Sequence, residues 1–247
     1  MMAQPQDGLE AFLSAHRPIR SRGRFAVGQR LGDWMVRAFV GRGGFGEVYR
    51  VVSERHGGEG ALKILVKAGR EAIFRQEVTL LQAIDGGHFL RLLDVGEADG
   101  HPFHVTELLE PAPLPSEPSA VAAFMLQVAE GVRQLHALGW AHRDLKRQNL
   151  LQRTDGTLVI GDVGLAARLG SLETRAVGTC GISAPEQFAG GAVTPQLDIH
   201  ALGVLIEQCF RANPPKPWEL LILQTTSSLP ERRLATIDDF IAALRRL

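Results

Sequence analysis

Hydrophobic residues in the first half of the chain gather in short runs that are typical of β-strands. The runs are rich in β-branched and aromatic residues, and glycine-rich turns such as Gly57–Gly60 separate them. The predicted strands cover Trp34–Val40, Glu47–Val52, Ala61–Val66, Phe89–Val95 and Phe103–Thr106. Between residues 71 and 84 the apolar positions recur every three or four residues, which predicts a helix. We therefore expect a small antiparallel sheet with one main helix.

The second half of the chain has helical periodicity instead. It follows a segment with four prolines between Pro111 and Pro118, which predicts a stiff, extended connector because proline is excluded from helix interiors. From Ser119 to Leu138 the apolar residues step by three and four. Further helices are predicted over Asp198–Phe210, Trp218–Leu223 and Ile237–Leu247. We expect a mainly helical second lobe, interrupted by one hairpin whose turn lies at Thr154–Gly156.

This change of periodicity sets the predicted domain organisation. Residues 1–30 carry little apolar pattern and are interpreted as an N-terminal extension, either a mobile tail or a strap across the first lobe, with a partner-docking arm as the alternative. Residues 31–247 are predicted to form one α+β domain. Its N-lobe covers about 31–109, its connector about 107–118 and its C-lobe about 119–247.

Composition narrows the class of protein. The chain is 45% hydrophobic and 22% charged, and Lys+Arg and Asp+Glu both number 27. A balanced charge gives no sign of a nucleic-acid partner. Cys180 and Cys209 are too few for a disulfide framework, and no apolar run has the roughly 18 residues of a membrane span. We expect a soluble, cytoplasmic protein with reduced thiols.

The polar octet His142–Asn149 holds the candidate chemistry. The Asp144 carboxylate is suited to accepting a proton from a hydroxyl, the Lys146 ammonium to a phosphate, and the Asn149 amide oxygen to a divalent metal ion. Phosphoryl transfer needs these groups, since its catalysis rests on positioning and charge neutralisation. The octet therefore predicts phosphoryl transfer, provided that its partners are present.

A glycine-rich segment, Gly41–Gly46, supplies the first partner. Glycines allow the backbone to approach an anionic ligand closely. A lone G-x-G-x-x-G also occurs in dinucleotide-binding folds, where it leads into a helix. Here the β-rich run Glu47–Val52 follows, so the pattern is strand, glycine loop, strand. This favours a hairpin that covers phosphates.

Lys63, in a predicted strand, and Asp162, directly after another, are candidates for the remaining groups that phosphoryl transfer needs. Lys63 lies between Leu62 and Ile64, and Glu77 on the predicted helix would pair with it and fix its ammonium group for nucleotide phosphates. The alternative is a lysine that faces solvent. Asp162 directly follows the hairpin and precedes a glycine two residues later, which suits metal coordination as well as an ordinary turn.

With these motifs in order, the chain resembles a eukaryotic-type protein kinase, and specifically the Ser/Thr kinases widespread in bacteria. The resemblance runs from about Trp34 to Leu247 and also includes Ala184-Pro185-Glu186 and Pro230-Glu231-Arg232-Arg233. It implies a bilobal fold with an ATP cleft between the lobes. It also implies ATP and Mg²⁺ or Mn²⁺ as cofactors, and a protein substrate with Ser or Thr.

The resemblance assigns roles residue by residue. The ATP site would comprise Gly41, Gly43, Phe45, Gly46, Val48, Ala61, Lys63, Thr106, Glu107, Leu109 and Leu151. The catalytic set would comprise Asp144 as base, Lys146 on the γ-phosphate, and the pair Lys63 and Glu77, while Asn149 and Asp162 would hold the metal. Structural or regulatory roles fall to His142, Arg143, Val163, Thr174, Thr179, Glu186, Asp198 and Arg233. Among these, Glu186 would pair with Arg233, and Asp198 would brace the backbone of the octet.

The sequence departs from the family pattern at several points. Val163 stands in place of the usual phenylalanine, and Ile182 in place of a common aromatic residue. The helix after the connector is missing or very short. Only 47 residues separate Glu186 from Arg233, so the substrate-docking helix usual in that interval is predicted to be deleted. These departures describe a minimal kinase.

Three functions remain open on these patterns. The first is a Ser/Thr protein kinase that also phosphorylates itself, and the alternatives are a pseudokinase-type nucleotide-binding scaffold and a phosphotransferase acting on a small molecule. Arg143 suggests control by a loop phosphate on Ser171, Thr174 or Thr179. Thr179 has a competing interpretation as a substrate-pocket residue hydrogen-bonded to Asp144. The substrate and the oligomeric state are not predicted.

Overall fold

The computed structural model describes residues 23–44, 46–84, 86–174, 176–211 and 213–247. The chain folds into two compact units. One unit takes the chain up to Gly86 together with Leu90–Glu110, and the other takes Gly87–Phe89 with Pro111–Leu247. The division falls inside β7 (Glu110–Pro111), at the start of the proline-rich segment that the sequence predicts as a connector.

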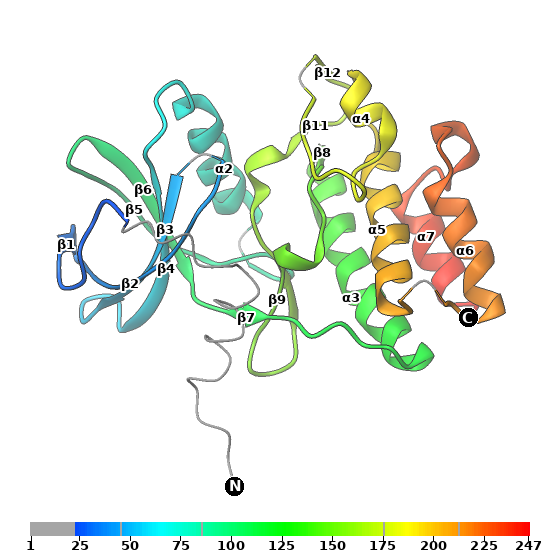
Figure 1. Ribbon diagram of the computed structural model, residues 1–247, viewed down its shortest axis with the longest axis horizontal. Coiled ribbons are helices and arrows are strands. Elements are labelled where there is room, and N and C mark those ends of the chain that lie inside the picture. Colours follow the sequence, from blue (N-terminus) through cyan, green and yellow to red (C-terminus); the bar gives the residue numbers. More distant parts are fainter. Residues whose placement is uncertain (1–22, 45, 85, 175, 212) are drawn as a thin grey trace, which may run out of the picture. The chain divides into compact units, whose positions relative to one another are not determined.

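Among the described residues, the first unit contains a six-stranded sheet and one helix, α2 (Glu71–Ile84) (Figure 1). The strand order is β1-β2-β3-β4-β6-β5, with every neighbouring pair antiparallel. The strands are β1 (Arg30–Leu31), β2 (Trp34–Arg42), β3 (Gly46–Ser53), β4 (Gly58–Leu65), β5 (Leu92–Ala98) and β6 (His101–Glu107). The predicted antiparallel sheet with its single main helix is confirmed.

Side chains along these strands alternate between buried and less buried positions, and the buried ones form the core of the first unit. In β3 every second residue from Glu47 is buried, as period-2 side-chain orientation requires. The buried apolar residues gather in one cluster that includes Trp34, Tyr49 and Phe103. Phe25 joins this cluster, and its ring packs edge-on against Tyr49 with centroids 5.7 Å apart. Phe25 therefore packs on the first unit. Residues 1–22, which make up most of the predicted extension, lie outside the described residues, so the strap stays a prediction.

One predicted strand begins later than expected. The sequence predicts a strand from Phe89, but β5 starts at Leu92. The reason is that residues 87–89 belong to the second unit, where Phe89 bridges Ile160 and the His88 carbonyl accepts from the Ile160 N–H at 2.7 Å. Arg153 also donates to the Phe89 carbonyl at 3.0 Å.

The second unit is mainly helical, and its short strands form small sheets of two or three strands (Figure 1). Its helices are α3 (Pro118–Ala137), α4 (Pro185–Ala189), α5 (Pro195–Cys209), α6 (Lys216–Thr226) and α7 (Ile237–Leu244), with 3₁₀ turns η1 (Arg147–Asn149), η2 (Val163–Leu165) and η3 (Pro230–Arg232). Its strands are β8 (Trp140–Ala141), β9 (Leu150–Gln152), β10 (Leu158–Ile160), β11 (Ala167–Arg168), β12 (Leu172–Glu173) and β13 (Gly191–Ala192). The predicted hairpin is the antiparallel pair β9–β10.

Helix α5 is the centre of the second unit, in contact with α3, α6 and α7. It is apolar on nearly all sides, which is the pattern of a helix buried within a domain. Gly203 allows the close approach of α6, because a Cβ at this position would collide with the Thr225 side chain. Helix α3 ends where the sequence predicts, with Gly139 in the left-handed region (φ 81°) just past the C-cap.

Two further expectations can be compared with the fold. Cys180 is exposed and Cys209 is buried, and both thiols are free. Across the described residues, no helix combines the length and the apolar character that crossing a bilayer requires. Between Phe210 and Lys216 the chain passes from α5 to α6 with no helix among the residues described there.

Candidate active site

A buried ion pair in the first unit joins β4 to α2. The Lys63 Nζ lies 2.7 Å from Glu77 Oε1 and 2.9 Å from Oε2, so the carboxylate receives both hydrogen bonds from one ammonium group. The Glu77 side chain is 3% exposed and that of Lys63 is 17% exposed. Glu77 is the polar member of the buried face of α2, which otherwise consists of Phe74, Leu80, Leu81 and Ile84. The predicted pairing of strand lysine with helix glutamate is present.

The glycine-rich hairpin joins β2 to β3, and its glycines face different surroundings. Gly43 N–H donates to the Gly46 carbonyl at 2.9 Å and closes the turn. A Cβ at Gly46 would collide with the Ile64 carbonyl, so glycine is sterically required there. A Cβ on Gly41 or Gly43 would meet nothing within 4 Å, so their backbones face open space. Phe45 lies outside the described residues.

Glu47, directly after this hairpin, is a buried carboxylate that the sequence did not single out. It accepts hydrogen bonds from the Arg24 N–H at 2.9 Å, from the Tyr49 hydroxyl and from Arg42. Burial alone raises the pKa of Glu47, but these hydrogen bonds outweigh burial and hold the pKa below its ordinary value. Burial, and then the Glu47 contact, raise the pKa of Tyr49 to about 12. The cluster fastens the segment around Arg24 to the base of the glycine hairpin.

In the second unit, Asp198 on α5 fixes the start of the polar octet. Its carboxylate is fully buried and accepts from the His142 N–H and from the Arg143 N–H, each at 2.8 Å. Burial raises the pKa of Asp198, but the hydrogen bond from His136 (2.9 Å) and the other donors lower it further than burial raises it. Arg143 adopts φ 68°, a strained conformation that these bonds hold in place. His136, in the last turn of α3, has a structural role here through its bond to Asp198.

Two side chains, those of Lys146 and Thr179, meet at the Asp144 carboxylate. Lys146 Nζ donates to Oδ2 at 2.7 Å, and the Thr179 hydroxyl donates to Oδ1 at 2.7 Å. Lys146 Nζ also donates to Thr179 Oγ1 at 3.2 Å, which closes a triangle of hydrogen bonds. Asp144 is 5% exposed, so the carboxylate is buried but has both oxygens engaged. Sequence analysis left two roles open for Thr179, and the structure has the hydrogen bond that one of them requires.

Backbone hydrogen bonds bring the two candidate metal ligands near one another. The Asn149 amide nitrogen donates to the Asp144 carbonyl at 2.9 Å, and the Gly161 N–H donates to the Asn149 carbonyl at 2.7 Å. Asp162 follows Gly161 in the left-handed region, with φ 51°. His142 Nδ1 accepts from the Asp144 N–H at 3.2 Å, and its Nε2 donates to the Gly161 carbonyl at 3.1 Å. The His142 ring therefore ties the octet to the segment that carries Asp162.

A second ion pair holds the segment after the long loop. Arg233 donates to both carboxylate oxygens of Glu186, at 2.6 and 2.8 Å, as the sequence predicts. The Arg233 side chain has no exposed surface, whereas that of Glu186 is 25% exposed. Nearby, His200 Nδ1 bonds the Ile182 carbonyl at 3.1 Å. Burial, followed by the charge of Arg233, lowers the pKa of His200.

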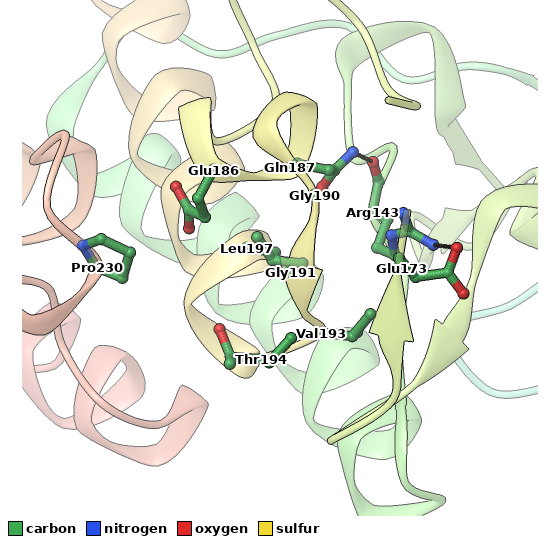
Figure 2. Close-up of a pocket in the computed structure, with 11 residues that line it drawn as sticks. Arg143, Glu173, Glu186, Gln187, Gly190, Gly191, Val193, Thr194, Leu197 and Pro230 are labelled. Carbon is green, nitrogen blue, oxygen red and sulfur yellow. Dashed lines mark hydrogen bonds and ion pairs between the residues drawn. The ribbon is translucent and has the colours of Figure 1, made fainter. Parts of the chain in front are cut away.

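A pocket of about 220 Å³ opens between this segment and the octet (Figure 2). Arg143 lines it, with a side chain that is 5% exposed and an Nε atom that has no hydrogen-bond partner among the described residues. The Arg143 guanidinium lies 3.5 Å from the Glu173 carboxylate on β12. Gln187 donates to the carbonyl of Arg143 at 2.7 Å and to that of Val177 at the same distance. Arg143 thus already has an anionic partner in the loop.

The remaining predicted residues have varied surroundings. Thr106 is buried on β6, and the Glu107 N–H donates to the Arg91 carbonyl at 3.0 Å. Val48, Ala61, Leu109 and Leu151 are partly buried, Val163 is buried, and Thr174 is exposed.

Sequence reasoning missed Glu47, His104, Glu173 and Gln187, each of which has a contact with a residue distant in the chain. Of these four, only Glu173 could have been found from the sequence. It is an anionic loop residue one position before a candidate phosphorylation site.

Comparison with known proteins agrees with this geometry. The sequence profile described as "Protein kinase domain" matches residues 34–228. Serine/threonine-protein kinase PknH of Mycobacterium bovis is 31% identical over 207 residues, which are 76% of this chain and 35% of that protein. PknD of Mycobacterium tuberculosis is 31% identical over 206 residues, 76% of this chain and 31% of that protein. PknL of the same species is 31% identical over 199 residues, which are 74% of this chain and 50% of that protein. The matched segments span between 31% and 50% of the length of these relatives.

Proposed function

This chain belongs to the protein kinase family, and we propose that it transfers the γ-phosphate of ATP to serine and threonine hydroxyl groups of proteins, its own included. The observation that carries the proposal is the arrangement at Asp144. The Thr179 hydroxyl donates to its Oδ1 at 2.7 Å, which is the interaction that a substrate hydroxyl needs before it attacks a phosphate. Lys146 on the other oxygen supplies a positive charge at the same point.

Asp144 would orient the hydroxyl and accept its proton as the hydroxyl oxygen forms a bond to the γ-phosphorus and the bond from that phosphorus to the bridging oxygen of ADP breaks, which releases ADP. Lys146, 2.7 Å away, would move its ammonium group toward the oxygens of the transferred phosphoryl group. The buried Asp198 bonds hold the backbone before Asp144, so the carboxylate does not have to be ordered when the substrate arrives. In the first unit, the Lys63 ammonium, anchored by Glu77, would bind the α- and β-phosphates.

The residues present suit a magnesium ion. Asn149 and Asp162 offer an amide and a carboxylate oxygen, the hard ligands that Mg²⁺ takes together with nucleotide phosphates. The Asn149 amide nitrogen is used by the Asp144 carbonyl, which orients the amide oxygen as the remaining ligand atom. A bound Mg²⁺ supplies neutralisation of the phosphate charge. Asn149 and Asp162 would hold it, and the hydrogen bond between Gly161 and Asn149 would keep them together.

Serine and threonine specificity is proposed on two grounds. The relatives PknH, PknD and PknL are named serine/threonine-protein kinases. Within this chain, Lys146 and Thr179 form the small polar surround of Asp144 that resembles the Ser/Thr class. We leave the substrate protein unassigned.

A small-molecule phosphotransferase is the second candidate. It is favoured by the passage from α5 to α6, where the residues described between Phe210 and Lys216 contain no helix on which a protein substrate would dock. The segment Ala184–Glu186, which resembles the peptide-binding platform of protein kinases, argues for a protein substrate. A phosphate-transfer assay distinguishes the two.

The experiment is a phosphate-transfer assay with labelled ATP and Mg²⁺, alone and with a generic protein substrate. Asp144→Asn should lower the rate by at least about 100-fold, the usual contribution of a positioned base, while ATP still binds. Lys63→Met should also cripple transfer. Asp155→Asn, which changes an exposed carboxylate in the β9–β10 turn, serves as the matched control and should keep the wild-type rate.

The outcomes separate the candidates. Label on a serine or threonine of any protein supports the proposal, and mapping of the modified residues identifies self-phosphorylation. ATP binding without any transfer by the wild type would refute the kinase function and favour a nucleotide-binding scaffold. Label on a metabolite and on no protein would favour the small-molecule reaction. Equal rates in wild type and Asp144→Asn would remove Asp144 from its role.

A further inference from the structure

His104 is a buried imidazole next to the Lys63–Glu77 pair, and nothing in the proposed reaction uses it. It lies on β6 and is 3% exposed. Antiparallel pairing sets it directly opposite Lys63 on β4. Its ring packs against Phe74 of α2 with centroids 5.2 Å apart. The imidazole is therefore enclosed by the same strand and helix that hold the ion pair.

The carboxylate of Glu77 is a near neighbour of the polar atoms of this ring. Neither Nδ1 nor Nε2 has a hydrogen-bond partner among the described residues. Nε2 lies 3.5 Å from Glu77 Oε1, the oxygen that also receives Lys63 Nζ at 2.7 Å. A distance of 3.5 Å is longer than an ordinary hydrogen bond but close enough to become one after a small rotation of the Glu77 carboxylate.

A purely structural role explains this residue poorly. A buried polar group without a hydrogen bond destabilises a protein relative to an apolar side chain of similar size. Phe74, the aromatic side chain that packs against the His104 ring, is itself buried, and Glu77 provides a polar group near the ring. An imidazole in this place gains only if the carboxylate of Glu77 receives its N–H. With the proton on Nε2, the ring is a donor that points toward Oε1.

We propose that His104 is a positioning residue that holds the Glu77 carboxylate, and through it the Lys63 ammonium, in the orientation needed for the phosphates of ATP. The proposal rests on the proposed function of Lys63. With His104 on one oxygen, Glu77 has donors from two directions, from β4 and from β6, and loses the freedom to turn away from Lys63. The expected consequence is tighter binding of the phosphates, with no effect on adenine.

The test measures affinity for ATP and for adenosine by calorimetry on the full chain, so it does not depend on phosphate transfer. His104→Leu removes the imidazole but preserves an apolar volume, and His104→Gln retains an N–H donor. Phe74→Leu disturbs the same packing without removing a polar group and is the matched control. Each His104 variant is also made in a Glu77→Gln background, which forms a double-mutant cycle.

We expect His104→Leu to weaken ATP binding about 3- to 10-fold, the range of one net hydrogen bond, and to leave adenosine binding unchanged. His104→Gln should restore most of the affinity. In the Glu77→Gln background the substitution of His104 should have no further effect, because the partner through which it acts is lost. Phe74→Leu should lower the melting temperature but keep the preference for ATP over adenosine.

Three results would overturn the proposal. The first is unchanged ATP affinity in His104→Leu, and the second is an equal loss for ATP and adenosine, which indicates general loosening of the fold. The third is an additive loss in the double variant, which shows that His104 does not act through Glu77. If instead ATP binds and the cycle shows coupling but no phosphate is transferred, the positioning role stands and the kinase function fails.

Discussion

Glu173 is the most informative residue to change in the long loop, because it is the anionic partner of Arg143. A phosphorylated threonine in this loop was one predicted partner for that arginine. In the structure the carboxylate of Glu173 lies 3.5 Å from the guanidinium, and strand β12, which carries it, pairs with β13. We predict that Glu173→Ala destabilises the second unit, and that unphosphorylated wild type is already active.

The magnitude follows from the burial of the two partners. Loss of one member of a fully buried ion pair removes about 3–5 kcal/mol, whereas exposed pairs contribute about 0–1 kcal/mol. Here the Arg143 side chain is 5% exposed and that of Glu173 is 35% exposed, and the pair is longer than a hydrogen bond. Water will partly replace the lost carboxylate. We expect a decrease of about 1–2 kcal/mol in the free energy of unfolding.

Urea denaturation of the unphosphorylated proteins measures this change, with Glu231→Ala, an exposed carboxylate in η3, as the control. The transfer assay is then run on wild type and Thr174→Ala after phosphatase treatment. Both should retain most of their activity, because Glu173 already neutralises Arg143. The reasoning is refuted if Glu173→Ala is as stable as Glu231→Ala, or if phosphatase treatment abolishes activity and Thr174 carries the phosphate that restores it.

Two further predictions concern stability. Because burial and Arg233 depress the pKa of His200 below 6.5, the unfolded chain binds a proton that the folded chain does not. Stability from His200 is complete above about pH 6.5 and falls with decreasing pH, by at most about 1.4 kcal/mol per pH unit; urea midpoints at pH 7.5 and 5.5 should differ less in His200→Gln than in wild type. Tyr49→Phe removes the hydroxyl that bonds Glu47 and accepts from the Phe25 N–H at 3.2 Å, and should lower the free energy of unfolding by about 1–3 kcal/mol. A melting temperature equal to that of wild type would contradict the second prediction.

The local sequence pattern predicted most of the fold because the spacing of hydrophobic residues in most segments matches the secondary structure that the segment adopts. The alternation in β3 and the three-and-four spacing in α2 both match the observed burial. Gly139 ends α3 through a backbone conformation that glycine adopts readily. The error at Phe89 has a different origin. Its residue type favours a strand, but its partner is Ile160, far along the chain, and no local signal carries that information.

In the candidate site, too, some contacts were predicted from the sequence and others depend on tertiary packing. The pair Lys63–Glu77 was predicted from the strand lysine, the helix glutamate and the nearby glycine loop, and the pair Glu186–Arg233 was implied by the family resemblance. His104 escaped prediction because a histidine in an apolar strand has no distinctive sequence context. Its meaning depends on the strand register that sets it opposite Lys63 and on the helix that covers it. Contacts of this kind follow from tertiary packing and require the structure.

The geometry also separates two loop threonines that are both candidate phosphorylation sites from the sequence. Thr179 lies within hydrogen-bond distance of both Asp144 and Lys146. A phosphate on Thr179 would bring a charge of about −1.5 to −2 against the Asp144 carboxylate, and the repulsion would disrupt the arrangement on which transfer depends. Thr174 is exposed and follows Glu173, so a phosphate there would lie near Arg143 without approaching Asp144. Phosphorylation that preserves activity is therefore compatible with Thr174, and phosphorylation of Thr179 is expected to inhibit.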